Sequence, residues 1–189
     1  MSGTRKHTNS IQPEIQAAQW RLRRFQGIME DMRPEDVVGE YREYELTYYD
    51  GTSRKVLVTD IETPYPDGKL IVSRTNTAGV ITHVNQAFVD MSGYTREELI
   101  GQPHYILRHP DMPRAAFKDL WDTVQSGKKW EGYVKNLRKD GGYYLVFASV
   151  VPNVRDGKIV GYTSVRRKPS RQKMEAALRL YARMREKEA

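Results

Sequence analysis

The chain has 189 residues, of which 39% are hydrophobic, a net charge of +7 and no cysteine. This length and composition can fill one hydrophobic core with extensions, whereas two full domains would be a stretch. The lack of cysteine excludes disulfides, thiolate metal sites and covalent thiol adducts with a cofactor, and a reducing, cytoplasmic compartment suits such a chain.

The positive charge is concentrated at the two ends. Residues 1–33 carry six basic and three acidic residues, residues 166–189 carry nine and three, and the stretch between them has 16 basic against 18 acidic residues. Basic ends of this kind are typical of solvated helix faces, with contact to an acidic partner or a membrane surface as the alternative. Because the centre is nearly neutral, no nucleic-acid site is predicted. No apolar run reaches the ~18–20 residues of a membrane-spanning helix, so no membrane span is predicted.

Residues 1–68 are interpreted as an N-terminal extension made of a helix and a β-hairpin. A helix is expected over Pro13–Met32, because proline suits a first helical turn and apolar residues recur at helical spacing. Asp50-Gly51 lies between two strand-like runs, Tyr41–Tyr49 and Arg54–Ile61, which is a strong hairpin pattern.

Residues 69–168 predict an α+β domain with two strands, then short helices, then three longer strands. The expected strands cover 70–75, 80–84, 130–138, 143–153 and 159–167, and the expected helices cover 86–91, the turn after Thr95, and 113–125. Asn85 is a helix cap, and Thr95 with Glu98 is a capping box. A five-stranded antiparallel sheet with helices on one face satisfies this order without long crossovers.

Residues 169–189 predict a C-terminal amphipathic helix, with Ser170 as its cap. Its apolar stripe requires a partner surface, either the sheet of the same chain or another chain.

Several runs resemble a known family. The first half of the domain resembles a PAS domain of the S-box kind, in the runs Gly79–Phe88, Ser92-Gly93-Tyr94 and Glu97–Pro103. Leu107–Pro113 and Trp130–Asn136 resemble, more narrowly, the flavin-binding PAS domain of bacterial aerotaxis receptors. The resemblance implies a PAS fold with a pocket between the sheet and the short helices, FAD in that pocket, and redox changes passed to an effector.

The polar segment between the helices supplies the first candidate cofactor-binding residues. Arg108 and His109 are expected to meet anionic or hydrogen-bonding parts of the cofactor, with Asp111 orienting one of them. The alternative is a turn in which Asp111 forms a salt bridge with Arg108.

Further candidates lie on the third strand and before the first helix. Trp130 and Asn136 are six residues apart, so they share one face of an ideal strand, where an indole can stack on a flavin ring and an amide can match its carbonyl and N–H edge. The alternatives are a core tryptophan and a strand-end asparagine. Asn85 also matches the family pattern, although helix capping explains it fully.

These residues lead to a prediction of function with open alternatives. We expect a non-enzymatic sensor of redox state, oxygen or energy that binds FAD, with FMN as the alternative flavin, and that signals through its flanking helices, as a homodimer, to a signalling protein or effector domain. The main alternative is a cofactor-free PAS module for dimerisation or protein interaction, and haem held by His83 or His104 is a weaker one. A flavoenzyme is disfavoured because no substrate-activating base accompanies the pocket residues. A free-standing sensor and a fragment of a longer receptor both remain open.

Overall fold

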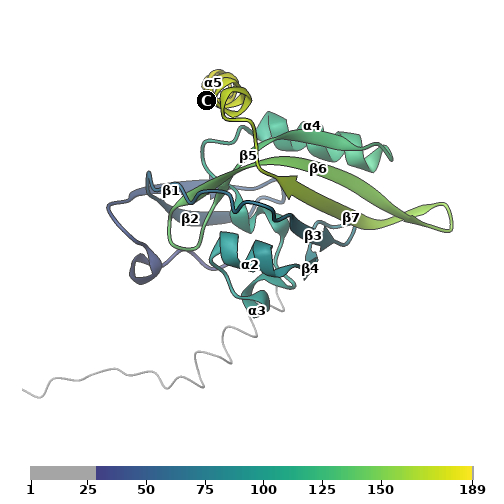
Figure 1. The fold of residues 1–189 in the computed structure, drawn as a ribbon, viewed down its shortest axis with the longest axis horizontal. Helices are drawn as coiled ribbons and strands as arrows, with labels where there is room; N and C mark the ends of the chain where they lie inside the picture. The colour runs from purple at the N-terminus through teal and green to yellow at the C-terminus, as the bar shows by residue number, and fades with distance from the viewer. Residues whose placement is uncertain (1–28, 189) are drawn as a thin grey trace, which may run out of the picture.

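The computed structural model describes residues 29–188, which contain a five-stranded antiparallel sheet with the strand order β4-β3-β7-β6-β5 (Figure 1). The strands are β3 (Ile71–Thr75), β4 (Ile81–Val84), β5 (Trp130–Leu137), β6 (Tyr143–Arg155) and β7 (Lys158–Arg167). The predicted α+β architecture is confirmed.

The long β6–β7 ribbon ends in a tight turn at Asp156-Gly157. Both residues adopt positive φ, 51° and 72°, which is the left-handed pair that a two-residue hairpin of matching twist requires. The turn lets β7 return along β6 to the centre of the sheet, where it also pairs with β3.

The helices pack on one face of the sheet. They are α2 (Gln86–Ser92), α3 (Arg96–Leu99), the 3-10 helix η2 (His104–Leu107) and α4 (Arg114–Gln125). Their buried residues, among them Phe88, Leu99, Leu107 and Val124, form one core cluster with sheet residues such as Val146. The helix η2 falls in a stretch for which the sequence predicted no helix.

Both predicted caps are present. The Asn85 side chain accepts a hydrogen bond from the Phe88 N–H, and Thr95 and Glu98 form the reciprocal capping box. These caps fix the first residue of α2 and of α3, and with it the course of the backbone that leads to η2.

The N-terminal hairpin consists of β1 (Arg42–Thr47) and β2 (Ser53–Val58), preceded by the short 3-10 helix η1 (Pro34–Asp36). Most of the helix expected over Pro13–Met32 lies outside the described residues. Its last four residues, 29–32, are described and are not helical, because the Met32 N–H donates to the Lys55 oxygen at 3.0 Å and the chain lies beside β2. The expected end of that helix was therefore wrong.

The hairpin is attached to the domain by a second, smaller core. Met32, Val56 and Leu57 pack there against Leu137 at the end of β5. The buried Arg54 adds three hydrogen bonds, from its guanidinium to the Glu30 oxygen at 2.7 Å, the Ile106 oxygen at 3.0 Å and the Tyr94 hydroxyl at 3.1 Å. Since removing one partner of such a buried network costs about 1–3 kcal/mol for each group left unsatisfied, the hairpin is held firmly.

The C-terminal helix α5 (Arg171–Glu186) packs on the sheet of its own chain. Met174 is fully buried, and the Tyr181 hydroxyl donates to the Tyr133 backbone oxygen at 2.8 Å. The own-sheet alternative for its partner surface is the one observed. Ser170 occupies the expected capping position, but its side chain makes no cap hydrogen bond.

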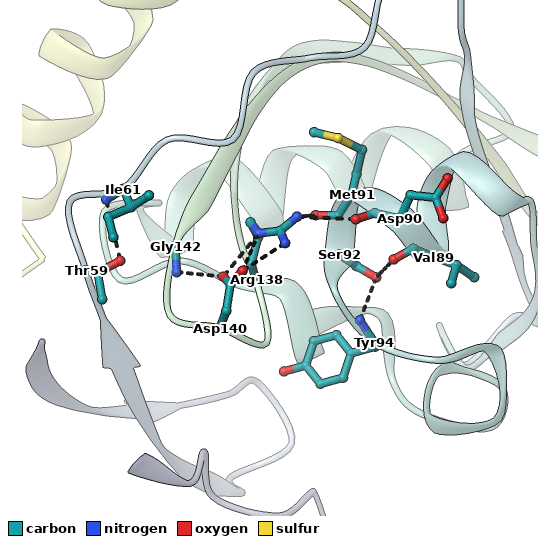
Figure 2. Close-up of polar contacts among 10 residues, drawn as sticks. All are labelled: Thr59, Ile61, Val89, Asp90, Met91, Ser92, Tyr94, Arg138, Asp140 and Gly142. Atoms are coloured by element: carbon teal, nitrogen blue, oxygen red, sulfur yellow. Dashed lines mark hydrogen bonds and ion pairs between the residues drawn. The ribbon is translucent and has the colours of Figure 1, made fainter. Parts of the chain in front are cut away.

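The turn between β5 and β6 is fixed to the end of α2, as Figure 2 shows. The Arg138 guanidinium binds the Asp140 carboxylate, at 2.8 Å from Nη2, and donates through Nη1 to the Met91 and Asp90 backbone oxygens. Asp140 also accepts from the Gly142 N–H at 3.1 Å. This network holds the end of β5 rigidly, two residues beyond Asn136.

Within residues 29–188, none of the helices combines the length and the apolar character needed to cross a membrane.

Candidate functional site: an internal cavity between the sheet and α4

A cavity of about 750 Å³ lies between the inner face of the sheet, η2 and α4. Its walls come from β3, β5, β6 and β7 on one side and from η2 and α4 on the other, and the tip of the β1–β2 hairpin adds a third wall. The size is in the range of small-molecule and cofactor sites, which combine apolar walls with a few convergent polar groups.

Two of the predicted residues, Trp130 and Asn136, lie in the same cavity wall on β5. Their side chains share the inner face, as even spacing predicts, and are 7% and 5% exposed. The Trp130 indole N–H donates to the Asp119 carboxylate on α4 at 2.7 Å, which holds the ring across the gap between strand and helix. The Asn136 amide nitrogen is buried and has no hydrogen-bond partner among residues 29–188.

Arg108 also lines the cavity, from the end of η2. Its guanidinium carbon lies 5.2 Å from the centre of the Phe117 ring, and its buried Nε has no hydrogen-bond partner in the described part of the chain. Burial lowers the pKa of Arg108 from its usual value. A partly buried cation with an unused donor is suited to an anionic ligand group.

His109 and Asp111 do not line the cavity. His109 is 2% exposed, its Nδ1 accepts from the Asp111 N–H at 3.0 Å, and burial, with the nearby Lys135 charge, lowers its pKa to about 3. The Asp111 carboxylate accepts from Lys135 Nζ at 2.7 Å and lies 3.4 Å from Arg185 of α5. Burial opposes its charge, but these cations and the Lys135 hydrogen bond lower the pKa of Asp111.

Asp111 is therefore paired with Lys135 and Arg185, and the alternative in which it pairs with Arg108 does not occur. The side chains of the segment from Arg108 to Asp111 therefore lie in two different environments. Arg108 faces the cavity, and Asp111 faces the C-terminal helix.

Asn85 lies outside the cavity wall. Its carbonyl oxygen accepts from the N–H groups of Phe88 and Val72, and its amide nitrogen donates to the Leu70 oxygen at 2.8 Å. The side chain is fully used in joining β3 to α2.

Arg166 is a cavity residue that sequence reasoning missed. It lies on β7, is 3% exposed, and donates to the Ser73 hydroxyl at 3.2 Å and to His104 Nε2 at 2.7 Å. Burial lowers the pKa of Arg166, and among the described residues its charge is opposed by no nearby carboxylate. Its place in the basic C-terminal stretch predicts a solvated side chain, whereas the structure places it in the cavity wall. The missed signal was its position two and four residues after the inward-facing Ser164 and Tyr162 on one strand.

The two candidate haem ligands are in different environments. Burial and the Arg166 charge lower the pKa of His104 to about 3, so its ring is neutral and Nε2 accepts the Arg166 hydrogen bond. His83 is exposed on β4 and does not line the cavity. Among residues 29–188, no group of three or more His, Asp or Glu side chains is placed to hold a metal ion.

Aromatic rings form much of the remaining wall. Trp121 of α4 meets Tyr162 of β7 edge-to-face at 5.5 Å between ring centres, and Tyr48 of the hairpin stacks on Tyr105 of η2 at 4.2 Å. Rings of this kind are surfaces on which a flat ligand can stack, and Asn136, Arg108 and Arg166 line the same cavity.

Comparison with known proteins gives one family and several relatives. A family model described as the PAS fold matches residues 81–166. The chain is 49% identical over 124 residues to the aerotaxis receptor of Escherichia coli, covering 66% of this chain and 24% of the receptor. It is 30% identical over 97 residues to the nitrogen fixation regulatory protein of Klebsiella pneumoniae, covering 51% of this chain and 20% of that protein.

The chain thus spans no more than about a quarter of the length of these relatives. Among solved structures, the light state of the blue-light photoreceptor Aureochrome1 LOV is similar, with a TM-score of 0.53 at 19% identity, covering 58% of this chain and 88% of that one. This likeness concerns the fold.

Proposed function

Since residues 81–166 belong to the PAS fold family, we propose that the chain is a sensory module that binds a flavin in the cavity and passes the state of the flavin to a partner protein. The proposal specifies FAD as the flavin, redox state, oxygen or energy supply as the signal, and the flanking helices as the route. It also specifies a cytoplasmic homodimer without enzymatic activity.

The observation that carries the proposal is the set of unpaired polar groups directed at an otherwise apolar cavity. Asn136 offers a buried amide nitrogen and Arg108 a buried Nε, both without a partner among residues 29–188, and Arg166 adds a buried cation that donates to the neutral Ser73 and His104 side chains. Leaving the Asn136 and Arg108 donors unsatisfied costs free energy, so they favour a ligand that provides acceptors. The carbonyl and nitrogen edge of an isoalloxazine ring provides them, and the residues present therefore fit a flavin.

The shape of the cavity supports the same ligand. Trp130 and Trp121 provide flat apolar surfaces, and stacking on such rings contributes about 0.5–1.5 kcal/mol beyond the burial of area. A bound flavin supplies a group that can gain or lose electrons. The surrounding side chains hold the ring, exclude water and offer hydrogen bonds that differ in strength between its redox states.

The relatives support a signalling role. One is by name a receptor for aerotaxis and another a regulatory protein, and both are matched over a minor part of their length. This is the pattern expected when a sensory domain is attached to different output domains.

The segment from Arg108 to Asp111 supplies a route for the signal. Arg108 lines the cavity and, three residues later, Asp111 binds Arg185 of α5 and Lys135 of β5. A change of ligand state that moves Arg108 can in this way change how firmly α5 docks. The change in docking free energy cannot exceed the difference in contact free energy between the two ligand states.

Visible absorption of the purified protein tests the proposal. The two-banded spectrum of an oxidised flavin, bleached by dithionite, is expected, and chromatography of the released cofactor distinguishes FAD from FMN. A colourless protein that takes up neither flavin would contradict the proposal and favour a cofactor-free interaction module. A single intense haem band, or steady oxidation of NADH by the isolated protein, would contradict it in favour of a haem sensor or a flavoenzyme.

A further inference from the structure

We propose that the tip of the β1–β2 hairpin and Arg108 form an outer subsite of the cavity that binds the adenosine diphosphate part of a flavin dinucleotide. The hairpin lies outside the residues matched by the family model, so this subsite is a property of the extension. The inference rests on the proposed function, and it identifies the residues of this chain that select FAD over smaller flavins.

The hairpin tip is a wall of the cavity. Thr47, Tyr48 and Tyr49 all line it, at the point where β1 ends. Tyr48 is 4% exposed and stacks on Tyr105, and Tyr49 meets Tyr105 edge-to-face at 5.6 Å. Three tyrosines therefore gather at this end, and Tyr49 is 69% exposed, which marks the end as the outer one. An adenine ring is a flat aromatic group that such a cluster can stack on.

Cations lie beside the aromatic cluster. Arg108, Arg114 and Lys118 line the same cavity. Arg114 is near Glu188 at 3.8 Å and Lys118 binds Asp122 at 2.5 Å, whereas Arg108 has no ion-pair partner among residues 29–188 and keeps its buried Nε unbound. A diphosphate offers several charged oxygens to an arginine fork and gives shorter, stronger hydrogen bonds than neutral acceptors give.

The subsite is preformed. Arg54 ties β2 to the Ile106 oxygen of η2, and the Asp50 carboxylate, which closes the hairpin turn by accepting from Thr52, also accepts from the Tyr105 hydroxyl at 2.5 Å. The hairpin and η2 are thus linked on both sides of the tyrosine cluster. Ordering a loop upon binding would reduce the affinity, and here little ordering is needed.

The inner and outer ends of the cavity have different chemistry. Asn136 and Arg166 are available for the edge of the flavin ring and the tip tyrosines for adenine, and Arg108, whose backbone pairs with that of Asn136, lies between them for the phosphates. Riboflavin can use only the inner end, FMN adds one phosphate, and FAD uses both ends. Comparing the three flavins therefore separates the contributions of the two ends.

The experiment measures the dissociation constants of FAD, FMN and riboflavin for the full chain after the flavin has been removed, by quenching of flavin fluorescence. Tyr49→Ala and Arg108→Gln are the test variants. Tyr44→Ala is the matched control, because Tyr44 lies on β1 of the same hairpin, is 38% exposed and does not line the cavity. Thermal melting of each variant shows whether the fold is kept.

We expect each test variant to weaken FAD about tenfold, since stacking or a charge-assisted hydrogen bond accounts for roughly one factor of ten. Riboflavin affinity should be unchanged in Tyr49→Ala, and the control should match the wild type. Equal loss for all three flavins, or no loss for FAD in either variant, would overturn the subsite while leaving flavin binding intact. Failure of the wild type to bind any of the three would instead contradict the proposed function.

Discussion

The two ends of the segment from Arg108 to Asp111 are three residues apart and serve different parts of the molecule. Arg108 lines the cavity and has an unused donor, whereas Asp111 is fully paired with Lys135 and Arg185 against α5. One short segment therefore joins the cavity to a flanking helix. Substitutions on the cavity side should therefore change ligand affinity, and those on the helix side should change stability and docking.

The largest effect is expected from Arg166, on the cavity side. Arg166→Gln removes the buried charge and should weaken flavin binding by about a hundredfold, because hydrogen bonds to charged groups contribute about 1.5–3 kcal/mol. Titration of the apo-protein with FAD measures this. Arg167→Gln is the matched control, since Arg167 is the next residue and is exposed. Equal affinities for the two variants would remove Arg166 from the binding site.

Asn136→Ala should weaken flavin binding about tenfold, because it removes a hydrogen bond whose donor has no other partner in the described residues. The sheet should stay folded, since the backbone pairing of Asn136 with Tyr144 remains. Flavin content after purification, together with circular dichroism, measures both. Asn153→Ala on β6, outside the cavity, is the control, and a variant that keeps its full flavin content would contradict the assignment of Asn136.

On the helix side, His109 should make stability depend on pH. The pKa of His109 is about 3 in the folded protein, against an ordinary value of 6.5. Its contribution to the free energy of unfolding is therefore complete above pH 6.5 and is lost as the pH falls towards 3. Between these two pKa values, the free energy of unfolding falls by up to ~1.4 kcal/mol for each pH unit per histidine. Urea unfolding between pH 7 and 4 measures it. His109→Gln should flatten the curve, and a curve identical to that of the wild type would show that the pKa of His109 is not lowered in the fold.

The smallest effect is expected from Asp111→Asn. The variant should lose about 1 kcal/mol of unfolding free energy at pH 7, as partly exposed ion pairs do, with unchanged flavin affinity. Because the pKa of Asp111 is lowered in the fold, this difference is present above the ordinary aspartate value and disappears as the pH falls through the folded pKa. Asp60→Asn, an exposed pair with Arg42, is the control. A loss of flavin affinity in Asp111→Asn would place both ends of the segment in one site.

The sequence was sufficient for the sheet, the caps and the β5 wall, because these depend on local periodicity and spacing. Trp130 and Asn136 share a face through the two-residue period of a strand alone. His109 and Asp111 were placed with Arg108 because neighbours in sequence were expected to be neighbours in function. The turn after η2 instead directs them to α5, and this depends on Lys135 and Arg185, which come from distant parts of the chain.

The cavity positions of Arg166 and of the hairpin tip could not be predicted from the sequence. Arg166 follows the inward alternation of β7, but its charge suggested solvent, and only the presence of Ser73 and His104 on other elements makes its burial favourable. The hairpin was predicted correctly as an element. Its position over the cavity depends on Arg54 and the second core, which are long-range contacts that no local pattern encodes.

The Arg138 network has a consequence for which elements can respond to the ligand. A responding element needs two arrangements of similar free energy. Arg138, held by Asp140, fixes the end of α2 to the β5–β6 turn through the Met91 and Asp90 oxygens, and a shift of α2 away from the turn would break these two hydrogen bonds. The α2 side therefore acts as a fixed reference, and conformational change is expected to be confined to α4, α5 and the segment between η2 and α4.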